Sequence, residues 1–236
     1  MTNYQTTDVF NYLSYMEHYL KGDLEVFHKI CQDAESRETT PTPAVTASNQ
    51  GSMYSEPVNS SSSSTTSQTT MYPGSEPSQY FTLRNNHQDI FRLTIPITLT
   101  LFAVVDCVGY LAGSNTNPLR TNENFKEFFK QSDPPLTDNE SEFLNQVFRQ
   151  GLTHIYFPKL GLGISYHSSN PAGKLLFKNG QGNLILNVNQ LEVIVIKTFE
   201  KIKQNQSLYT QMETRYQALI TDYQTKYANT IASYPL

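Results

Sequence analysis

An arginine and a histidine with four residues between them are the strongest candidates for chemistry in this sequence. Arg149 and His154 belong to the segment FRQGLTH, residues 148–154. A histidine exchanges protons near neutral pH, and a guanidinium group holds a phosphate through two parallel hydrogen bonds. The pair therefore predicts chemistry on a phosphate, with His154 as the group that transfers the proton.

The spacing of Arg149 and His154 limits how their side chains could act on one substrate. Five steps along a straight α-helix turn the chain by about 500°, so the two side chains point about 140° apart. Some further feature must therefore bring Arg149 and His154 to the same substrate, and we consider three. The long Arg149 side chain could reach around the helix, Gly151 could loosen the helix, or a second copy of the chain could complete the site.

An acidic residue on an earlier helix is the expected helper. Asp106 shares a helical stripe with Leu99, Phe102, Ala103 and Tyr110. An acid on an apolar stripe must find a partner or stay protonated, and Arg149 and His154 are the obvious partners. Two interpretations stay open. One is a functional triad in which Asp106 holds Arg149 or orients His154, and the other is a buried salt bridge that only joins two helices.

Residues 149–154 resemble the R-x4-6-H signature of HEPN domains, which are small helical bundles found in toxins and antiviral systems. In the ribonuclease members of that family the Arg and His act across a dimer. They cleave RNA without metal, through attack of the ribose 2′-OH on the adjacent phosphate. The resemblance covers about residues 85–205, and it implies that His154 transfers the proton, Arg149 holds the phosphate and Asp106 supports the site. It also implies a homodimer.

A basic stretch follows the motif and is consistent with RNA as the substrate. Six lysines against two glutamates give residues 155–205 a local charge of +4, and Tyr156, Phe157, Tyr166 and Phe177 lie among them. Such a surface suits a single strand of nucleic acid, and we expect Lys159, Lys174 and Lys178 to contact it. The alternative is an ordinary solvated face over core aromatic residues.

The amino-acid composition of the chain argues against several functional classes of protein. The chain has 236 residues and a formal net charge of -4, so the whole protein is not a general binder of polyanions. Cys31 and Cys107 do not form a disulfide framework, and residues 1–8 do not resemble a signal peptide, so we expect a cytoplasmic protein. No histidine has metal-ligand spacing with Cys, Asp or Glu, so no metal or other cofactor is expected.

The pattern along the chain predicts four parts. Residues 1–35 are an N-terminal helical segment with a break at Gly22-Asp23. Residues 36–80 are rich in Ser and Thr and are predicted to be a disordered linker. Residues 81–205 are the HEPN-like helical domain, and residues 206–236 are a C-terminal helix. The predicted fold class is mostly α, a HEPN-like helical bundle with a small β-hairpin insert and extra terminal helices.

Within the helical domain, the apolar run 93–113 is long enough to cross a bilayer. Asp106 and the lack of flanking Lys or Arg clusters favour a buried helix instead, so a membrane partner is not expected. A short amphipathic helix over 122–130 and a helix over 137–155 should follow, the second opened by a Thr137/Glu140 capping box. Strands are predicted at 161–167, 174–178 and 183–188, and a long helix at 191–228.

These observations leave three functional interpretations. The first is a HEPN-like, metal-independent endoribonuclease in a toxin or phage-defence setting. The second is a non-catalytic HEPN-like interaction module, which binds a protein partner or self-associates through the terminal helices. Gln150 beside Arg149 and the polar, aromatic C-terminal helix favour this second interpretation. The third is a membrane-associated protein that inserts residues 93–113, against which Asp106 is the main evidence.

Overall fold

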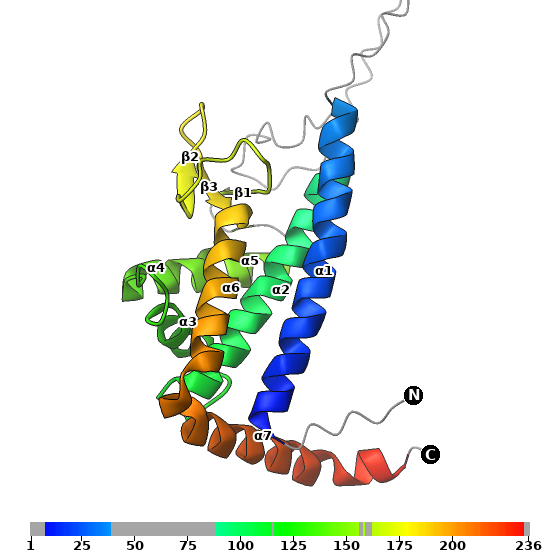
Figure 1. The fold of residues 1–236 in the computed structure, drawn as a ribbon, viewed down its shortest axis with the longest axis vertical. Helices are drawn as coiled ribbons and strands as arrows, with labels where there is room; N and C mark the ends of the chain where they lie inside the picture. The colour runs from blue at the N-terminus through cyan, green and yellow to red at the C-terminus, as the bar shows by residue number, and fades with distance from the viewer. Residues whose placement is uncertain (1–7, 39–87, 115, 156–157, 159–161, 234–236) are drawn as a thin grey trace, which may run out of the picture.

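The protein is mostly helical with one small sheet, as the sequence predicted in outline (Figure 1). The computed structural model describes residues 8–38, 88–114, 116–155, 158 and 162–233. The helical elements are α1 (Val9–Glu38), α2 (Gln88–Ala112), α3 (Thr121–Phe129), α4 (Asp138–Phe143), a π-helical turn (Leu144–Arg149), α5 (Gln150–Ile155), α6 (Val188–Gln204) and α7 (Gln206–Ala232). The strands are β1 (Gly163–Ser165), β2 (Leu176–Lys178) and β3 (Leu184–Asn187). The predicted linker lies, from residue 39 onward, outside the described residues.

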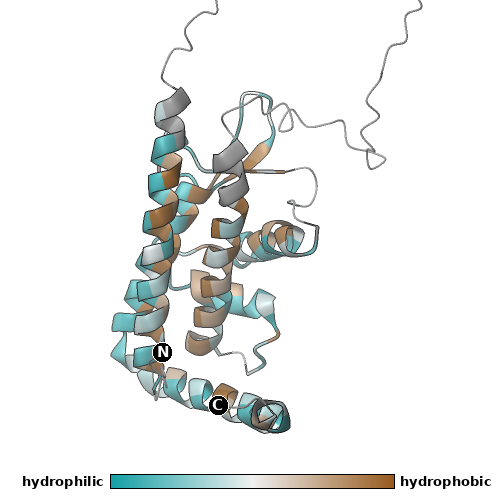
Figure 2. Ribbon diagram, turned by 90° about the vertical axis from the view of Figure 1, so that its right-hand side faces the viewer, coloured by the Kyte–Doolittle hydropathy of each residue, from teal (hydrophilic) through white to brown (hydrophobic). Residues whose placement is uncertain are grey.

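Helix α2 is the central element and is largely brown in the hydropathy view (Figure 2). It contacts α1, α3, α6 and α7. Among the described residues, Thr94–Ala112 is the one stretch of helix long and apolar enough to cross a membrane, and 67% of it is buried inside the fold. Packing within the protein thus accounts for its apolar composition, as expected for a buried core helix.

Helix α1 packs on this body through an apolar stripe that includes Leu13, Leu20, Leu24 and Phe27. The expected break at Gly22 is wrong, because the helix runs through it without interruption. Gly22 is exposed with nothing within 4 Å of the position its Cβ would take. The glycine therefore costs the helix only its intrinsic penalty of about 1 kcal/mol, which the packing on both sides outweighs.

Three ion pairs join α1 to α6 in antiparallel order. The carboxylate of Glu17 lies 2.6 Å from Lys203 Nζ, and that of Glu200 lies 3.0 Å from Lys21 Nζ. Further along, His28 Nε2 lies 3.0 Å from a carboxylate oxygen of Glu192. These contacts, of which the His28 one is an ion pair only when the histidine is protonated, join α1 to α6, so the N-terminal segment is part of the main body.

The three predicted strands and the turn between the last two are confirmed. Strands β2 and β3 pair antiparallel through the turn at 179–182, and β1 adds to the other edge of β3 in parallel. Gly182 has a φ of 82°, a left-handed conformation that glycine adopts without strain. The sequence predicted a hairpin, and the structure extends it to a three-stranded sheet that leads directly into α6.

The predicted continuous helix over 191–228 is wrong at one point, because Asn205 separates α6 from α7. Asn205 has the extended angles φ -81° and ψ 93°, and its side chain accepts a hydrogen bond from the Ser207 backbone N–H at 3.1 Å. The bend turns α7 under the C-terminal end of α2. There Gln211 donates to the carbonyl of Ala112 at 2.9 Å, and Arg215 donates to that of Tyr110 at 2.5 Å.

Candidate functional site

The structure brings Asp106 of α2 and Arg149 of the π-helical turn together, as the sequence predicted. Nη2 of Arg149 lies 3.3 Å from Oδ2 of Asp106. The two side chains keep 26% and 21% of their surface exposed, so the pair lies at the edge of the core. The second carboxylate oxygen of Asp106 accepts a hydrogen bond from the Asn124 side chain at 2.8 Å.

Asn124 of α3 is a site residue that the sequence reasoning missed. It is 1% exposed and also donates to the carbonyl of Pro118 at 3.1 Å. It reaches Asp106 because α3 lies very close to α2. A Cβ added to Gly109 would lie 2.0 Å from the Asn124 carbonyl oxygen. The signal that could have found this contact is the four-residue spacing of Gly109 and Gly113, because small residues at that spacing allow close helix packing.

The helix over 138–155 begins as predicted and then contains a feature that was not predicted. Thr137 and Glu140 form the expected capping box. The next turn, Leu144–Arg149, is π-helical. Buried Asn145 donates to Thr121 Oγ1 at 3.2 Å and to the Asn122 side chain, which ties this turn to the start of α3. A π turn holds an extra residue and often marks a functional site, and Arg149 is its last residue.

His154 does not join the pair. It lies in α5 with an exposed side chain, and it makes no hydrogen bond or ion pair with any residue that the structure describes. Gly151 and Leu152, between the two motif residues, are buried. Arg149 thus points toward α2 while His154 faces solvent, so the two side chains diverge as their spacing predicted. Within one chain the expected triad is a pair, Asp106 and Arg149, with a free histidine on the next turn.

Burial raises the pKa of the Asp106 carboxyl above its ordinary value, although the Asn124 hydrogen bond and the charge of Arg149 act in the opposite direction. Removing the carboxylate from water is thus the largest effect. The neighbouring Cys107 thiol also has a raised pKa because of burial, and it lies 3.3 Å from the Tyr12 hydroxyl. A reactive thiolate is therefore not expected there.

The raised pKa of Asp106 predicts the sign of its effect on stability. In the pH range between the ordinary and the raised value, the folded state binds more protons than the unfolded state, so the free energy of unfolding falls as pH rises. We expect the free energy of unfolding, measured with urea from about pH 4 to about pH 7, to include this fall with rising pH in the wild type. The Asp106→Asn variant should lack it. If the free energy of unfolding of the wild type rises with pH relative to that of Asp106→Asn, burial is not the main influence on the pKa of this carboxyl.

The basic surface is smaller than the sequence count suggested. Lys174 precedes strand β2 and Lys178 ends it, and both are exposed, whereas Lys159 lies outside the described residues. Two other lysines are engaged elsewhere, because Lys201 donates to the Gln131 carbonyl at 2.7 Å and Lys203 pairs with Glu17. The sequence could not show these partners, since each lies far away along the chain.

Tyr166, one of the aromatic residues of the basic stretch, packs against α1. Its ring centroid lies 4.5 Å from that of Phe27, and its ring also stacks on His28. This side chain stabilises the attachment of α1 to the sheet end of the molecule and is not available as an open stacking platform for RNA.

Comparison of the chain with protein-family models, curated proteins and solved structures gives no match. The described residues contain no cluster of three or more His, Cys, Asp or Glu side chains that could hold a metal ion. Neither Cys31 nor Cys107 forms a disulfide bond. A functional conclusion therefore rests on the arrangement of Asp106, Asn124, Arg149 and His154.

Proposed function

We propose that the protein is a HEPN-like, metal-independent endoribonuclease of the cytoplasm, acting in a toxin or phage-defence setting. The observation that carries the proposal is the arrangement around Arg149. Asp106, whose carboxylate also accepts a hydrogen bond from Asn124, pairs with the guanidinium from the core side while 26% of the Arg149 side chain stays exposed, and the His154 side chain is exposed on the following turn. An oriented cation and an accessible histidine are the two kinds of group that metal-free phosphate cleavage uses.

The reaction follows from these two groups. His154 takes the proton of the ribose 2′-OH, whose oxygen attacks the adjacent phosphorus, and Arg149 stabilises the added negative charge. The bond to the 5′ oxygen breaks, that oxygen takes up a proton from solvent while His154 releases the proton that it took, and the RNA ends in a 2′,3′-cyclic phosphate. Because Arg149 and His154 diverge on one helix, a second copy of the chain is needed to complete the site around one phosphate.

The test is an assay of the purified full chain on several labelled RNAs, with and without EDTA. We expect cleavage that EDTA does not reduce, with cyclic phosphate at the new 3′ ends and a free hydroxyl at the new 5′ ends. Sedimentation should show that the active species is a dimer. A folded dimer that cleaves none of the RNAs would overturn the ribonuclease proposal.

A specific feature of α7 supports the second candidate, a non-catalytic module that self-associates or binds a protein partner. In the first part of α7 the side chains of Met212 and Tyr216 are buried, whereas residues 221–230 are all exposed. The exposed end of the helix extends past α1 (Figure 1). Tyr223 and Tyr227 stack on each other there with 51% and 43% of their surfaces exposed. Stacked, exposed rings on a projecting helix are a typical contact for another protein.

For self-association we expect the double variant Tyr223→Ser/Tyr227→Ser to weaken the dimer at least about tenfold, since aromatic anchors often contribute 2 kcal/mol or more to an interface. Sedimentation equilibrium measures the change, and circular dichroism checks that helix content is kept. The matched control is Tyr19→Ser, which changes a 59% exposed tyrosine of α1. A wild-type chain that is monomeric at all concentrations would contradict self-association.

A further inference from the structure

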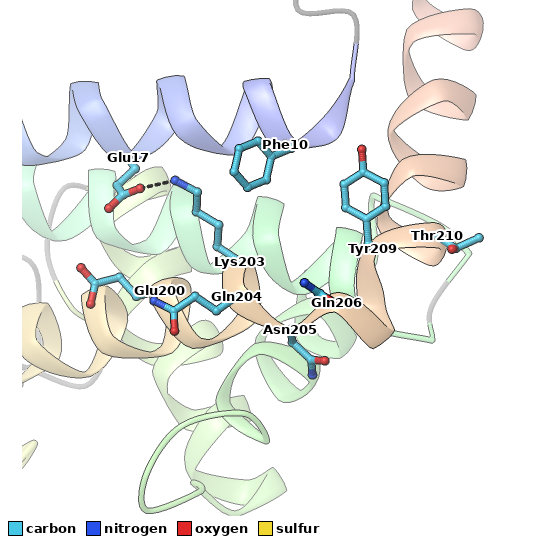
Figure 3. Close-up of a pocket in the computed structure, with 9 residues that line it drawn as sticks. All are labelled: Phe10, Glu17, Glu200, Lys203, Gln204, Asn205, Gln206, Tyr209 and Thr210. Atoms are coloured by element: carbon cyan, nitrogen blue, oxygen red, sulfur yellow. Dashed lines mark hydrogen bonds and ion pairs between the residues drawn. The ribbon is translucent and has the colours of Figure 1, made fainter.

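A second site candidate lies where α1, α6 and α7 meet, on elements other than the helix over 138–155. A hollow of about 890 Å³ opens there, lined by Phe10, Glu17, Lys203, Gln204, Gln206 and Tyr209 among others (Figure 3). This volume is within the range of small-molecule sites. The bend at Asn205 creates the hollow, because it turns the start of α7 away from the line of α6.

Two aromatic rings border the hollow from different helices. Phe10 of α1 is 49% exposed, and Tyr209 of α7 is 41% exposed. Figure 3 shows the rings on opposite sides of the opening, with Gln206 between and below them. Rings held apart on two packed helices leave a space that a flat group can enter and stack against.

Glu17, Glu200 and Lys203, the charged residues that line the hollow, are all engaged in ion pairs. Glu17 binds both Lys203 and Lys21 at 2.6 Å, and Lys21 also binds Glu200 at 3.0 Å. The Lys203 ammonium lies 5.3 Å from the centre of the Phe10 ring. Lys21 does not line the hollow, but its ammonium group compensates the second carboxylate from just outside, so the hollow offers no uncompensated charge to a phosphate or to a cation. The chemistry favours an uncharged ligand.

The polar groups left to a ligand are amides. The exposed side-chain amides of Gln204 and Gln206 make no hydrogen bond to another residue in the described part of the chain. An amide side chain both donates and accepts, so it can match the alternating donors and acceptors on the edge of a base. From the two rings, the balanced charge and the two amides we infer that this hollow binds an unstacked nucleobase.

This inference goes beyond the proposed cleavage reaction and does not depend on it. Stacking of a base on an aromatic side chain tolerates any base, and it accounts for about a five- to 150-fold change in affinity per ring on substitution by alanine. Recognition that uses rings and amides alone is insensitive to salt, in contrast to recognition of phosphates. A single strand of RNA could therefore be held here by a base while its backbone runs elsewhere.

The experiment is a calorimetric or NMR titration of the full chain with adenosine, cytidine and their 5′-monophosphates. We expect each nucleoside to bind as well as its monophosphate, with little change between about 50 mM and about 200 mM salt. Phe10→Ala and Tyr209→Ala should each weaken binding about five- to 150-fold. Tyr209→Phe keeps the ring and should bind normally, as should Tyr19→Ala, which changes an exposed tyrosine of α1 outside the hollow.

Three results would overturn the inference. The first is the absence of saturable binding by any nucleoside to the folded protein. The second is equal binding of ribose 5-phosphate, which would mean that the site recognises phosphate. The third is binding of N-acetyltyrosine amide with the same dependence on Phe10 and Tyr209, which would assign the hollow to a protein side chain. Loss of RNA cleavage with intact nucleoside binding would count only against the ribonuclease proposal.

Discussion

Gly109→Ala is expected to destabilise the protein by more than about 3 kcal/mol, at the upper end of what overpacking costs. The added methyl group would lie 2.0 Å from the Asn124 carbonyl oxygen and 3.1 Å from the Phe128 Cβ. Because the closest atom belongs to the backbone of α3, the whole helix must move away from α2. That movement also separates the Asn124 side chain from Asp106 and disturbs the support of Arg149.

Thermal unfolding measures this effect. For a protein of this size the melting temperature should fall by about 6 to 12 °C. The matched control is Gly22→Ala, at a helical glycine with nothing within 4 Å, which should leave stability unchanged or raise it by up to about 1 kcal/mol. A Gly109→Ala protein as stable as the wild type would show that α2 and α3 do not approach this closely.

His154→Ala is expected to reduce RNA cleavage by about 10²- to 10⁴-fold, the usual contribution of a general acid or base. Its melting temperature should stay close to that of the wild type. His154 is exposed and has no hydrogen bond or ion pair to any residue in the described ranges, so its removal leaves no buried group without a partner. Surface substitutions of this kind change stability by at most about 0.5 kcal/mol.

The matched control is His18→Ala, which removes an exposed histidine from α1 and should keep full activity. Cleavage and thermal unfolding are measured on the same preparations, with EDTA present. A large fall in melting temperature for His154→Ala would assign this residue a structural role. Unchanged cleavage by His154→Ala would assign the reaction to other groups of the protein.

Several local features of the fold could be predicted from short stretches of the sequence. The Thr137/Glu140 capping box, the strands around residues 179–182 and the stripe that carries Asp106 all depend on neighbours a few residues apart. Arg149 was one of two partners that the sequence offered for Asp106, with His154 as the other, because a carboxylate on an apolar stripe needs a partner. The break at Gly22 was predicted wrongly, since packing of α1 outweighs a local helix preference.

The sequence by itself thus determined the mostly helical class and the hairpin, because spacing and residue type control these within a helical turn or a strand, and it narrowed the partners of Asp106 to Arg149 and His154 without choosing between them. Only the tertiary structure decided the position of Asn124, the π turn that precedes Arg149, the exposure of His154 and the hollow between Phe10 and Tyr209. Each of these depends on contacts between residues far apart along the chain. Such contacts arise from the packing of whole helices against each other. Gly109 allows α3 to approach α2 closely, and Asn205 provides the bend between α6 and α7.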